Sequence, residues 1–293
     1  MNLRKNTQNL NLQNNRKDIM STKIVGLDLD GTLLNQYNEI TLETKKYIKK
    51  LQKNDIKVVI ATGRTFTAAK RYHNELNLKT PLISCNGGFI YNPLENKVIE
   101  GHAIDFKVLK KIFTLLEKGN TFYQYYTAQK IYSKEYKYLL KEWKKENESL
   151  DKEDKMDINI INKPLEQLKN KDPIFKILVI EKDKKKYIKL YKFLEKIDSL
   201  EIVSSFEGAI DIMVKGITKG NALKNVARYL NIDFKNSLAI GDNDNDATML
   251  KMAKIGVAME NGSKEAKLNA DFITTTNNNN GVVKALKKYI DFK

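Results

Sequence analysis

The stretch Ile-Val-Gly-Leu-Asp-Leu-Asp-Gly-Thr-Leu-Leu at residues 24–34 constrains the fold of this chain more than any other. Its branched apolar residues are typical of a strand buried on both faces, as in parallel sheets. Asp28 and Asp30 end this strand and, with a side-chain period of two, start on the same side. Buried carboxylates need a cationic partner, and open parallel sheets bind ligands at the carboxyl ends of their strands. We therefore interpret Asp28 as a nucleophile and Asp30 as its acid/base partner, beside a divalent metal.

A second acidic cluster follows another short apolar strand, within residues 237–246. Three aspartates alternate there with two asparagines, and oxygen ligands without His or Cys favour Mg²⁺ over Zn²⁺. An EF-hand calcium loop begins similarly, but it needs Gly at its sixth position and Glu at its twelfth. Those positions hold Ala247 and Ala253, which excludes the EF-hand. A solvated acidic turn is the alternative for this segment alone, and the presence of the first cluster favours a metal site.

Hydroxyl groups and cations stand at two further places, as phosphoryl transfer by positioning and charge stabilisation requires. One apolar strand ends in Thr62, Gly63 and Arg64, and a hydroxyl followed by backbone N–H groups at a helix start can hold a phosphate oxygen. Thr218 is a candidate cap for another helix, which places Lys219 in its first turn. Because a cation there opposes the helix dipole, we expect Lys219 to have a partner elsewhere.

These four segments, in this order, resemble the motifs of the haloacid dehalogenase-like superfamily, a group of mostly Mg²⁺-dependent phosphatases. The matching residues are Asp-Leu-Asp-Gly-Thr at 28–32, Thr62, Lys219, and Gly-Asp with Asn-Asp at 241–246. The sequences Ala-Thr-Gly-Arg at 61–64 and Ser-Cys-Asn-Gly-Gly at 84–88 are similar to those of the Cof-type (class IIB) subgroup. The resemblance spans about residues 22–290 in outline, although only the core motifs are specific.

The resemblance implies a role for each of these residues. Asp28 would attack phosphorus and form an aspartyl-phosphate, and Asp30 would protonate the leaving oxygen and then activate water. Mg²⁺ would be held by the Asp28 carboxylate, the Asp30 backbone carbonyl and Asp242, with Asp246 outside the coordination shell as an orienting residue. The candidates for phosphate or substrate binding are Thr62, Gly63, Arg64, Asn86, Lys219 and Asn245.

Alternating strands and helices predict an α/β fold with a doubly wound parallel sheet, a Rossmann-like core and an inserted α+β cap domain. We expect a disordered tail at 1–21, a catalytic core at 22–87 and 209–293, and an α+β cap domain at 88–208. In the core, a helix over 41–53 is expected to begin at Thr41 and to be buried through Leu42, Ile48 and Leu51.

Composition narrows the classes of function. The 293 residues suffice for about two domains. The single cysteine excludes an internal disulfide, and Cys85 lacks the Arg six positions later that a thiol phosphatase needs, since Tyr91 stands there. A net charge of +16 raises nucleic acid as a partner, but the basic residues are spread along the chain, so we expect no specific nucleic-acid site. No apolar run reaches a membrane span of roughly 20 residues, and no signal segment is evident. We therefore expect a cytoplasmic protein without a membrane partner.

The cap would set substrate choice, and its sequence is less informative. Tyr123, Tyr125, Tyr126 and Tyr132 could stack on a sugar, although buried strand aromatics are commoner, and Trp143 is expected to be a packing residue. We predict a Mg²⁺-dependent phosphatase of small phosphorylated metabolites, with sugar phosphates first. A phosphotransferase such as a phosphohexomutase on the same fold, or a non-catalytic binding protein, remains an alternative, and the oligomeric state is open.

Overall fold

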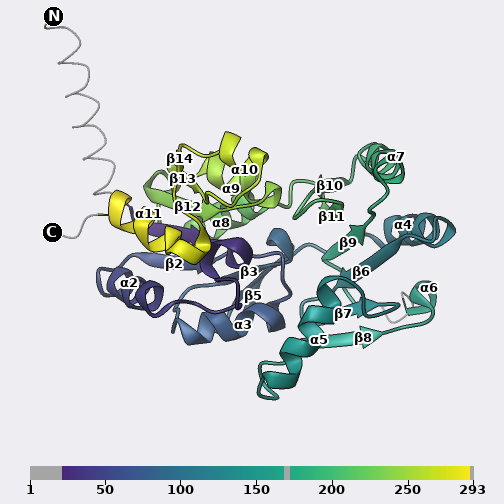
Figure 1. The fold of residues 1–293 in the computed structure, drawn as a ribbon, viewed down its shortest axis with the longest axis horizontal. Coiled ribbons are helices and arrows are strands. Elements are labelled where there is room, and N and C mark those ends of the chain that lie inside the picture. Colours follow the sequence, from purple (N-terminus) through teal and green to yellow (C-terminus); the bar gives the residue numbers. More distant parts are fainter. Residues whose placement is uncertain (1–21, 168–171, 291–293) are drawn as a thin grey trace, which may run out of the picture.

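A five-stranded parallel sheet, here called the core sheet, lies at the centre of the larger half of the molecule (Figure 1). The structure is a computed structural model that describes residues 22–167 and 172–290, so the predicted tail at 1–21 lies outside the described residues. The strand order is β14-β13-β12-β1-β2. The strands are β1 (Ile24–Leu27), β2 (Lys57–Ile60), β12 (Ser237–Gly241), β13 (Ile255–Ala258) and β14 (Phe272–Ile273). This parallel sheet confirms the predicted α/β class.

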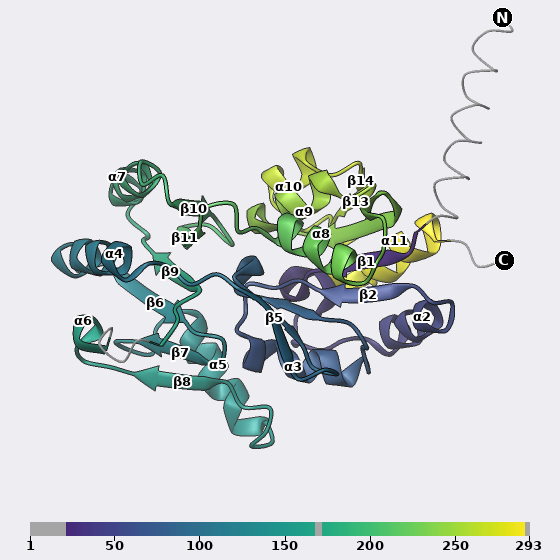
Figure 2. The ribbon, with the colours of Figure 1, turned by 180° about the vertical axis from the view of Figure 1, so that it is seen from behind.

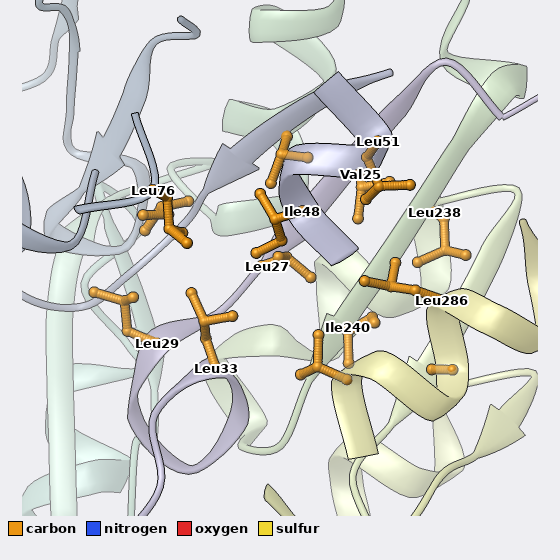
Figure 3. Close-up of a cluster of buried hydrophobic side chains, with 14 of the residues drawn as sticks. Val25, Leu27, Leu29, Leu33, Ile48, Leu51, Leu76, Leu238, Ile240 and Leu286 are labelled. Carbon is orange, nitrogen blue, oxygen red and sulfur yellow. The ribbon is translucent and has the colours of Figure 1, made fainter. Parts of the chain in front are cut away.

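Helices cover both faces of the core sheet, so the core has three layers. On one face pack α2 (Leu42–Lys53), α3 (Phe66–Glu75) and α11 (Gly281–Tyr289), whose apolar side chains meet Val25 and Leu27 of β1 (Figure 3). On the other face pack α8 (Lys219–Tyr229), α9 (Ala247–Met252) and α10 (Lys264–Leu268). Strands buried from both sides must be apolar throughout, which is why β1 reads as an uninterrupted hydrophobic run.

Helix α2 begins at the predicted cap, but one of its apolar residues is not buried as predicted. The Thr41 hydroxyl accepts a hydrogen bond from the Thr44 N–H, which caps the helix as predicted. Ile48 and Leu51 are fully buried, but Leu42 is 66% exposed, so its predicted burial is wrong. At about 100° per residue, Leu42 lies about 120° around the helix from Ile48 and faces solvent.

A second sheet has three antiparallel strands: β3 (Leu82–Ser84), β4 (Phe89–Asn92) and β5 (Lys97–Gly101). An isolated parallel bridge between Ala61 and Ile83 connects β3 to the end of β2. Strands β4 and β5 therefore form a hairpin that extends the core rather than the cap.

The third sheet, here called the cap sheet, has the order β10-β11-β9-β6-β7-β8 and lies beside the core (Figures 1 and 2). Its strands are β6 (Phe122–Tyr126), β7 (Lys130–Ser133), β8 (Asp157–Ile160), β9 (Lys176–Ile180), β10 (Leu200–Val203) and β11 (Ala209–Val214). Helices α4 (Phe106–Lys118) and α7 (Lys184–Leu194) pack on one face, and α5 (Leu139–Ser149) packs on the other. The short helix α6 (Pro164–Gln167) follows β8.

The sheets suggest domain limits that differ from those expected from sequence. Strands β4 and β5 pair with a core strand, and β11 belongs to the cap sheet. We propose a core and a cap whose limits lie near residues 102 and 217, rather than at 88 and 208, so that each sheet stays whole. Among the described residues, no helix combines the length and the apolar character that a membrane crossing requires.

Candidate active site

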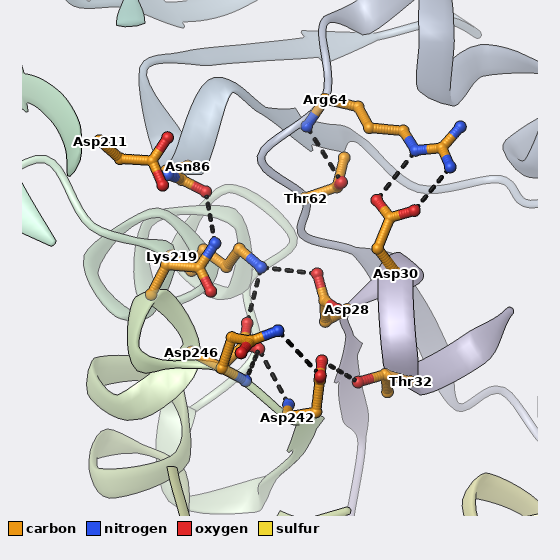
Figure 4. Close-up of polar contacts among 12 residues, drawn as sticks. Asp28, Asp30, Thr32, Thr62, Arg64, Asn86, Asp211, Lys219, Asp242 and Asp246 are labelled. Carbon is orange, nitrogen blue, oxygen red and sulfur yellow. Dashed lines mark hydrogen bonds and ion pairs between the residues drawn. The ribbon is translucent and has the colours of Figure 1, made fainter. Parts of the chain in front are cut away.

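Polar side chains from several separate loops converge where β1, β2 and β12 end (Figure 4). Asp28 follows β1, Asp242 follows β12, and Lys219 opens α8. Neighbouring parallel strands end at the same edge of a sheet, so residues far apart in sequence meet there. The structure thus brings together Lys219 and three of the predicted aspartates, Asp28, Asp242 and Asp246.

Lys219 is the cation at the centre of this cluster. Its Nζ lies 2.6 Å from Asp28 Oδ1 and 2.6 Å from Asp246 Oδ1, and all three side chains are buried. The other oxygen of Asp246 accepts hydrogen bonds from the backbone N–H groups of Asp242 and Asn243. Lys219 therefore has the distant partners expected of a cation at a helix start, and both oxygens of Asp246 are engaged.

Asp242 is held by two neighbours that the sequence did not single out. The Thr32 hydroxyl donates to its Oδ1 at 3.0 Å, and the Asn243 side-chain amide donates to its Oδ2 at 2.8 Å. Gly31, with φ +79°, lies directly against this carboxylate, and an added Cβ would stand 2.4 Å from Asp242 Oδ2. A glycine is thus required both by the left-handed backbone and by the close approach.

The cluster has more negative charge than its own cation neutralises. Burial, then the Asp246 carboxylate, raise the pKa of Asp28 to about 7, although Lys219 acts in the opposite direction. Burial, then the carboxylates of Asp28 and Asp246, raise the pKa of Asp242 to about 9. For Lys219, burial favours the neutral form, but Asp246 and Asp28 outweigh it and raise the pKa. Three carboxylates around one ammonium therefore leave a deficit of positive charge.

A metal ion fits this deficit. One oxygen from each of Asp28, Asp242 and Asp246 lies within 4.8 Å of the others. An all-oxygen set of carboxylates suits a hard cation such as Mg²⁺. Asp28 and Asp242 line a cavity beside the cluster, whereas the fully buried Asp246 faces Lys219 and two backbone N–H groups, so Asp28 and Asp242 are better placed to bind the ion directly.

Asp30 turns away from the cluster and pairs with Arg64. The guanidinium donates from Nε to Asp30 Oδ2 at 2.9 Å and from Nη2 to Oδ1 at 2.6 Å. Arg64 is buried, with its guanidinium 5.2 Å from the centre of the Tyr72 ring, whereas the Asp30 side chain is 53% exposed. Burial favours a higher pKa for Asp30, but Arg64 outweighs it through its charge and its hydrogen bonds and lowers the pKa. This two-point contact holds Asp30 ionised.

The predicted phosphate-binding residues lie on the neighbouring loops. The Thr62 hydroxyl accepts a hydrogen bond from the Arg64 N–H, and Asn245 Nδ2 donates to Asn86 Oδ1 at 3.1 Å. All of these side chains are buried, and Gly63 lies against Asn86. Within the described residues, Asn245 Oδ1 is buried without a hydrogen-bond partner. This side of the site thus offers an acceptor that a ligand could satisfy.

A cavity of about 340 Å³ lies between the cluster of Asp28, Asp242, Asp246 and Lys219 and the cap sheet. Asp28, Asp30 and Asp242 line it on the core side. Tyr126, which the sequence suggested as a possible sugar-stacking residue, lines it from the cap, together with cap residues that the sequence did not identify as functional: Leu139, Trp143, Lys176, Leu178, Ser205 and Phe206. The cavity is therefore built by both halves of the molecule.

The cap residues divide into two groups. Tyr123, Tyr125 and Tyr132 pack in the apolar layer under α4, as expected for strand aromatics, whereas Tyr126 faces the cavity. Trp143 packs among apolar residues, but it also lines the cavity, and its ring lies 5.8 Å from the Arg64 guanidinium, so it is more than the packing residue expected. The sequence could have pointed to Lys176, because this lysine interrupts the otherwise apolar run at 174–180.

Comparison with known proteins agrees with this geometry. A family model described as haloacid dehalogenase-like hydrolase matches residues 25–286. The chain is 32% identical to the phosphatase YwpJ of Bacillus subtilis over 282 residues, which cover 90% of this chain and 99% of the relative.

Two further relatives extend the comparison. The 5-amino-6-(5-phospho-D-ribitylamino)uracil phosphatase YcsE of the same bacterium is 31% identical, covering 94% of this chain and 98% of the relative. A solved haloacid dehalogenase-like hydrolase from B. subtilis superposes with a TM-score of 0.81 at 31% identity, over 91% of this chain and 99% of that one. The chain therefore belongs to the haloacid dehalogenase-like hydrolase family, and its relatives support a phosphatase activity.

Proposed function

We propose that this protein is a Mg²⁺-dependent phosphatase that hydrolyses small phosphorylated metabolites through an aspartyl-phosphate on Asp28. Sugar phosphates are the leading candidates for its substrates. The observation that carries the proposal is the buried cluster of Asp28, Asp242, Asp246 and Lys219, of which Asp28 and Asp242 line a cavity. Such a cluster is costly to bury, and it serves a purpose where a phosphoryl group and a metal complete its charge balance.

Asp28 is the nucleophile in this proposal. One of its carboxylate oxygens bonds to phosphorus as the bond from phosphorus to the ester oxygen breaks, and water then cleaves the aspartyl-phosphate to free phosphate. Lys219, 2.6 Å away, favours the ionised form of Asp28 that attack requires.

Asp30 is the acid and base in this proposal. Because Arg64 keeps the Asp30 carboxylate ionised, Asp30 can take a proton from the water that hydrolyses the intermediate. To protonate the leaving oxygen in the first step it must carry a proton, so its contact with Arg64 has to loosen as substrate binds. Thr62, Gly63, Asn86 and Asn245 would contact the phosphoryl group or the substrate.

Mg²⁺ would be held by the carboxylates of Asp28 and Asp242 and by the backbone carbonyl of Asp30. Asp246 would act from outside the coordination shell, since it is fully buried behind Lys219 and two backbone N–H groups and, unlike Asp28 and Asp242, is not among the residues that line the cavity. When bound, Mg²⁺ supplies positive charge that stabilises the phosphoryl group during transfer.

Cavity size and one relative support a small substrate with hydroxyl groups. A volume of about 340 Å³ is at the lower end of the range for ligand pockets, roughly 300–1,000 Å³, and favours a metabolite of monosaccharide size. The relative YcsE is named for a uracil with a phosphorylated ribitylamino chain, in which the phosphate ester stands on a chain that carries hydroxyl groups. A cytoplasmic location, and the absence of a specific nucleic-acid partner, stay predictions.

The test is phosphate release across a panel of sugar phosphates, nucleotides and vitamin phosphates, with Mg²⁺ or with EDTA. Asp28→Asn should abolish release, and Asp244→Asn is the matched control, because its carboxylate lies in the adjacent loop and bonds Ser263 instead. Phosphate release by Asp28→Asn would show that Asp28 is not the nucleophile. Phosphate release in EDTA would show that the reaction needs no metal. Transfer to a second hydroxyl without free phosphate would indicate a phosphotransferase, and no reaction with any compound would indicate a binding protein.

A further inference from the structure

A second buried ion pair lies in the cap sheet, outside the catalytic cluster. Lys176 Nζ on β9 lies 2.9 Å from Asp211 Oδ1 on β11, and the two side chains are 4% and 0% exposed. Asp211 pairs in register with Leu178, two residues from Lys176, so both charged side chains stand on the same face of the sheet. Burying such a pair in apolar strands costs free energy that packing alone does not require.

The ammonium of Lys176 stands at the boundary between the cap and the catalytic core. Lys176 lines the cavity, and its Nζ lies 4.4 Å from the centre of the Tyr126 ring. A Cβ added to Gly63 would stand 3.2 Å from this Nζ, so the side chain reaches from the cap to the loop proposed to bind phosphate. Asp211, the ion-pair partner of this ammonium, is fully buried.

The polar groups around this point favour a hydroxyl group as the ligand. Asp211 balances the charge of Lys176, so the pair is close to neutral and attracts a second anion weakly. In the described part of the chain, neither oxygen of Asp211 makes a hydrogen bond of good geometry, and Asn245 Oδ1 is buried without a donor. Lys176 and Asn245 both line the cavity. A donor beside an unsatisfied acceptor complements a hydroxyl, which both accepts and donates.

We propose that Lys176 binds a hydroxyl of the substrate's leaving group and that Asp211 is the positioning residue that holds its ammonium in place. This rests on the proposed function and deepens it: the selected substrates are phosphate monoesters whose leaving group carries neutral hydroxyl groups, as in sugars and sugar alcohols. Tyr126 and Trp143 form the apolar wall against which such a leaving group packs.

The test compares two substrates on one enzyme: a hexose phosphate, and 4-nitrophenyl phosphate, whose leaving group has no further hydroxyl. Lys176→Met should lower kcat/KM for the hexose phosphate by about 10- to 100-fold, as for loss of a hydrogen bond from a charged donor, and leave that for 4-nitrophenyl phosphate within about threefold. Lys184→Met, at an exposed lysine of α7, is the matched control and should change neither.

Asp211→Asn tests the positioning role. It leaves the ammonium without its counter-charge, so the ratio of kcat/KM for a hexose bisphosphate to that for the monophosphate should rise above the wild-type ratio. A merely structural change would lower both values together. Should Lys176→Met fail to fold, as judged by thermal melting, Lys176→Arg keeps the charge with different geometry and should show the same selective loss.

The outcomes separate this inference from the proposed function. Equal losses for both substrates in Lys176→Met, or an unchanged bisphosphate ratio in Asp211→Asn, would overturn the assignment while phosphatase activity stands. A wild-type protein that releases phosphate from no compound of the panel described above, these two substrates included, would overturn the proposed function itself.

Discussion

Lys219→Met should be among the most destabilising substitutions in this protein, because it removes the one ammonium between two buried carboxylates. The contacts to Asp28 and Asp246 are both 2.6 Å long, and all three side chains are at most 6% exposed. At an effective dielectric constant of about 20, each contact has a Coulomb energy of about 6 kcal/mol before the cost of desolvation is subtracted. Once that cost is included, breaking a buried pair typically lowers the free energy of unfolding by about 3–5 kcal/mol, and we expect this loss.

The loss should depend on pH in a direction that the site dictates. The pKa of Lys219 is raised, so its ammonium stabilises the fold at every pH below the ordinary lysine value of 10.5. Its partner Asp28 has a pKa raised to about 7 and is therefore mostly protonated at about pH 5.5. Without Mg²⁺, Lys219→Met should thus cost more at about pH 8 than at about pH 5.5.

Urea denaturation at both pH values measures these differences. Lys224→Met is the matched control, since Lys224 is exposed on the same helix and its replacement should stay within about 0.5 kcal/mol of wild type. A loss below about 1 kcal/mol for Lys219→Met at pH 8, or a larger loss at the lower pH, would refute the reasoning.

Three other predictions concern the metal site and the core. Because the pKa values of Asp28 and Asp242 are raised from 3.8 to about 7 and about 9, the metal-free fold keeps protons that the unfolded chain has lost, so its free energy of unfolding falls as the pH rises through this range. Mg²⁺ should therefore raise the melting temperature more at about pH 8.5 than at about pH 5.5, and an equal rise would contradict the charge deficit. Gly31→Ala places a Cβ 2.4 Å from Asp242 Oδ2 at a residue with φ +79°. It should lower the free energy of unfolding by about 1–3 kcal/mol and weaken Mg²⁺ binding in a thermal-shift titration. Unchanged Mg²⁺ affinity would count against Asp242 as a ligand. Leu286→Ala, at a fully buried position of α11, should cost about 2–5 kcal/mol in urea denaturation, whereas exposed Lys284→Ala should cost little, and equal effects would mean that α11 does not close the core.

Much of the core could be predicted from the sequence because its signals are local. The uninterrupted apolar run of β1 predicts a strand buried on both faces, and the core sheet confirms it. The hydroxyls of Thr41 and Thr218 cap their helices at the predicted places. Leu42 was misplaced because it lies off the apolar stripe that Ile48 and Leu51 occupy, and an apolar residue in the first helical turn need not face the core.

The site was predictable in its identities and less so in its contacts. Motif residues such as Asp28 and Lys219 could be predicted to meet because parallel strands share one carboxyl edge. The pairing of Asp30 with Arg64, and the support of Asp242 by Thr32, depend on side-chain directions that no motif specifies. Lys176 and Asp211 were visible as charges in apolar strands, but the role we propose for them could not be inferred without knowing which face of the cap sheet turns toward the core.

The sequence by itself determined the α/β class, the helix caps and the chemical inventory of the site, because apolar periodicity and capping act over a few residues. Only the tertiary structure decided that β4 and β5 extend the core, that Trp143 reaches Arg64, and that Lys176 stands beside Gly63. These contacts join segments far apart in the chain. Their geometry is set by how whole sheets and helices pack, and periodicity constrains which face is buried but not what that face meets.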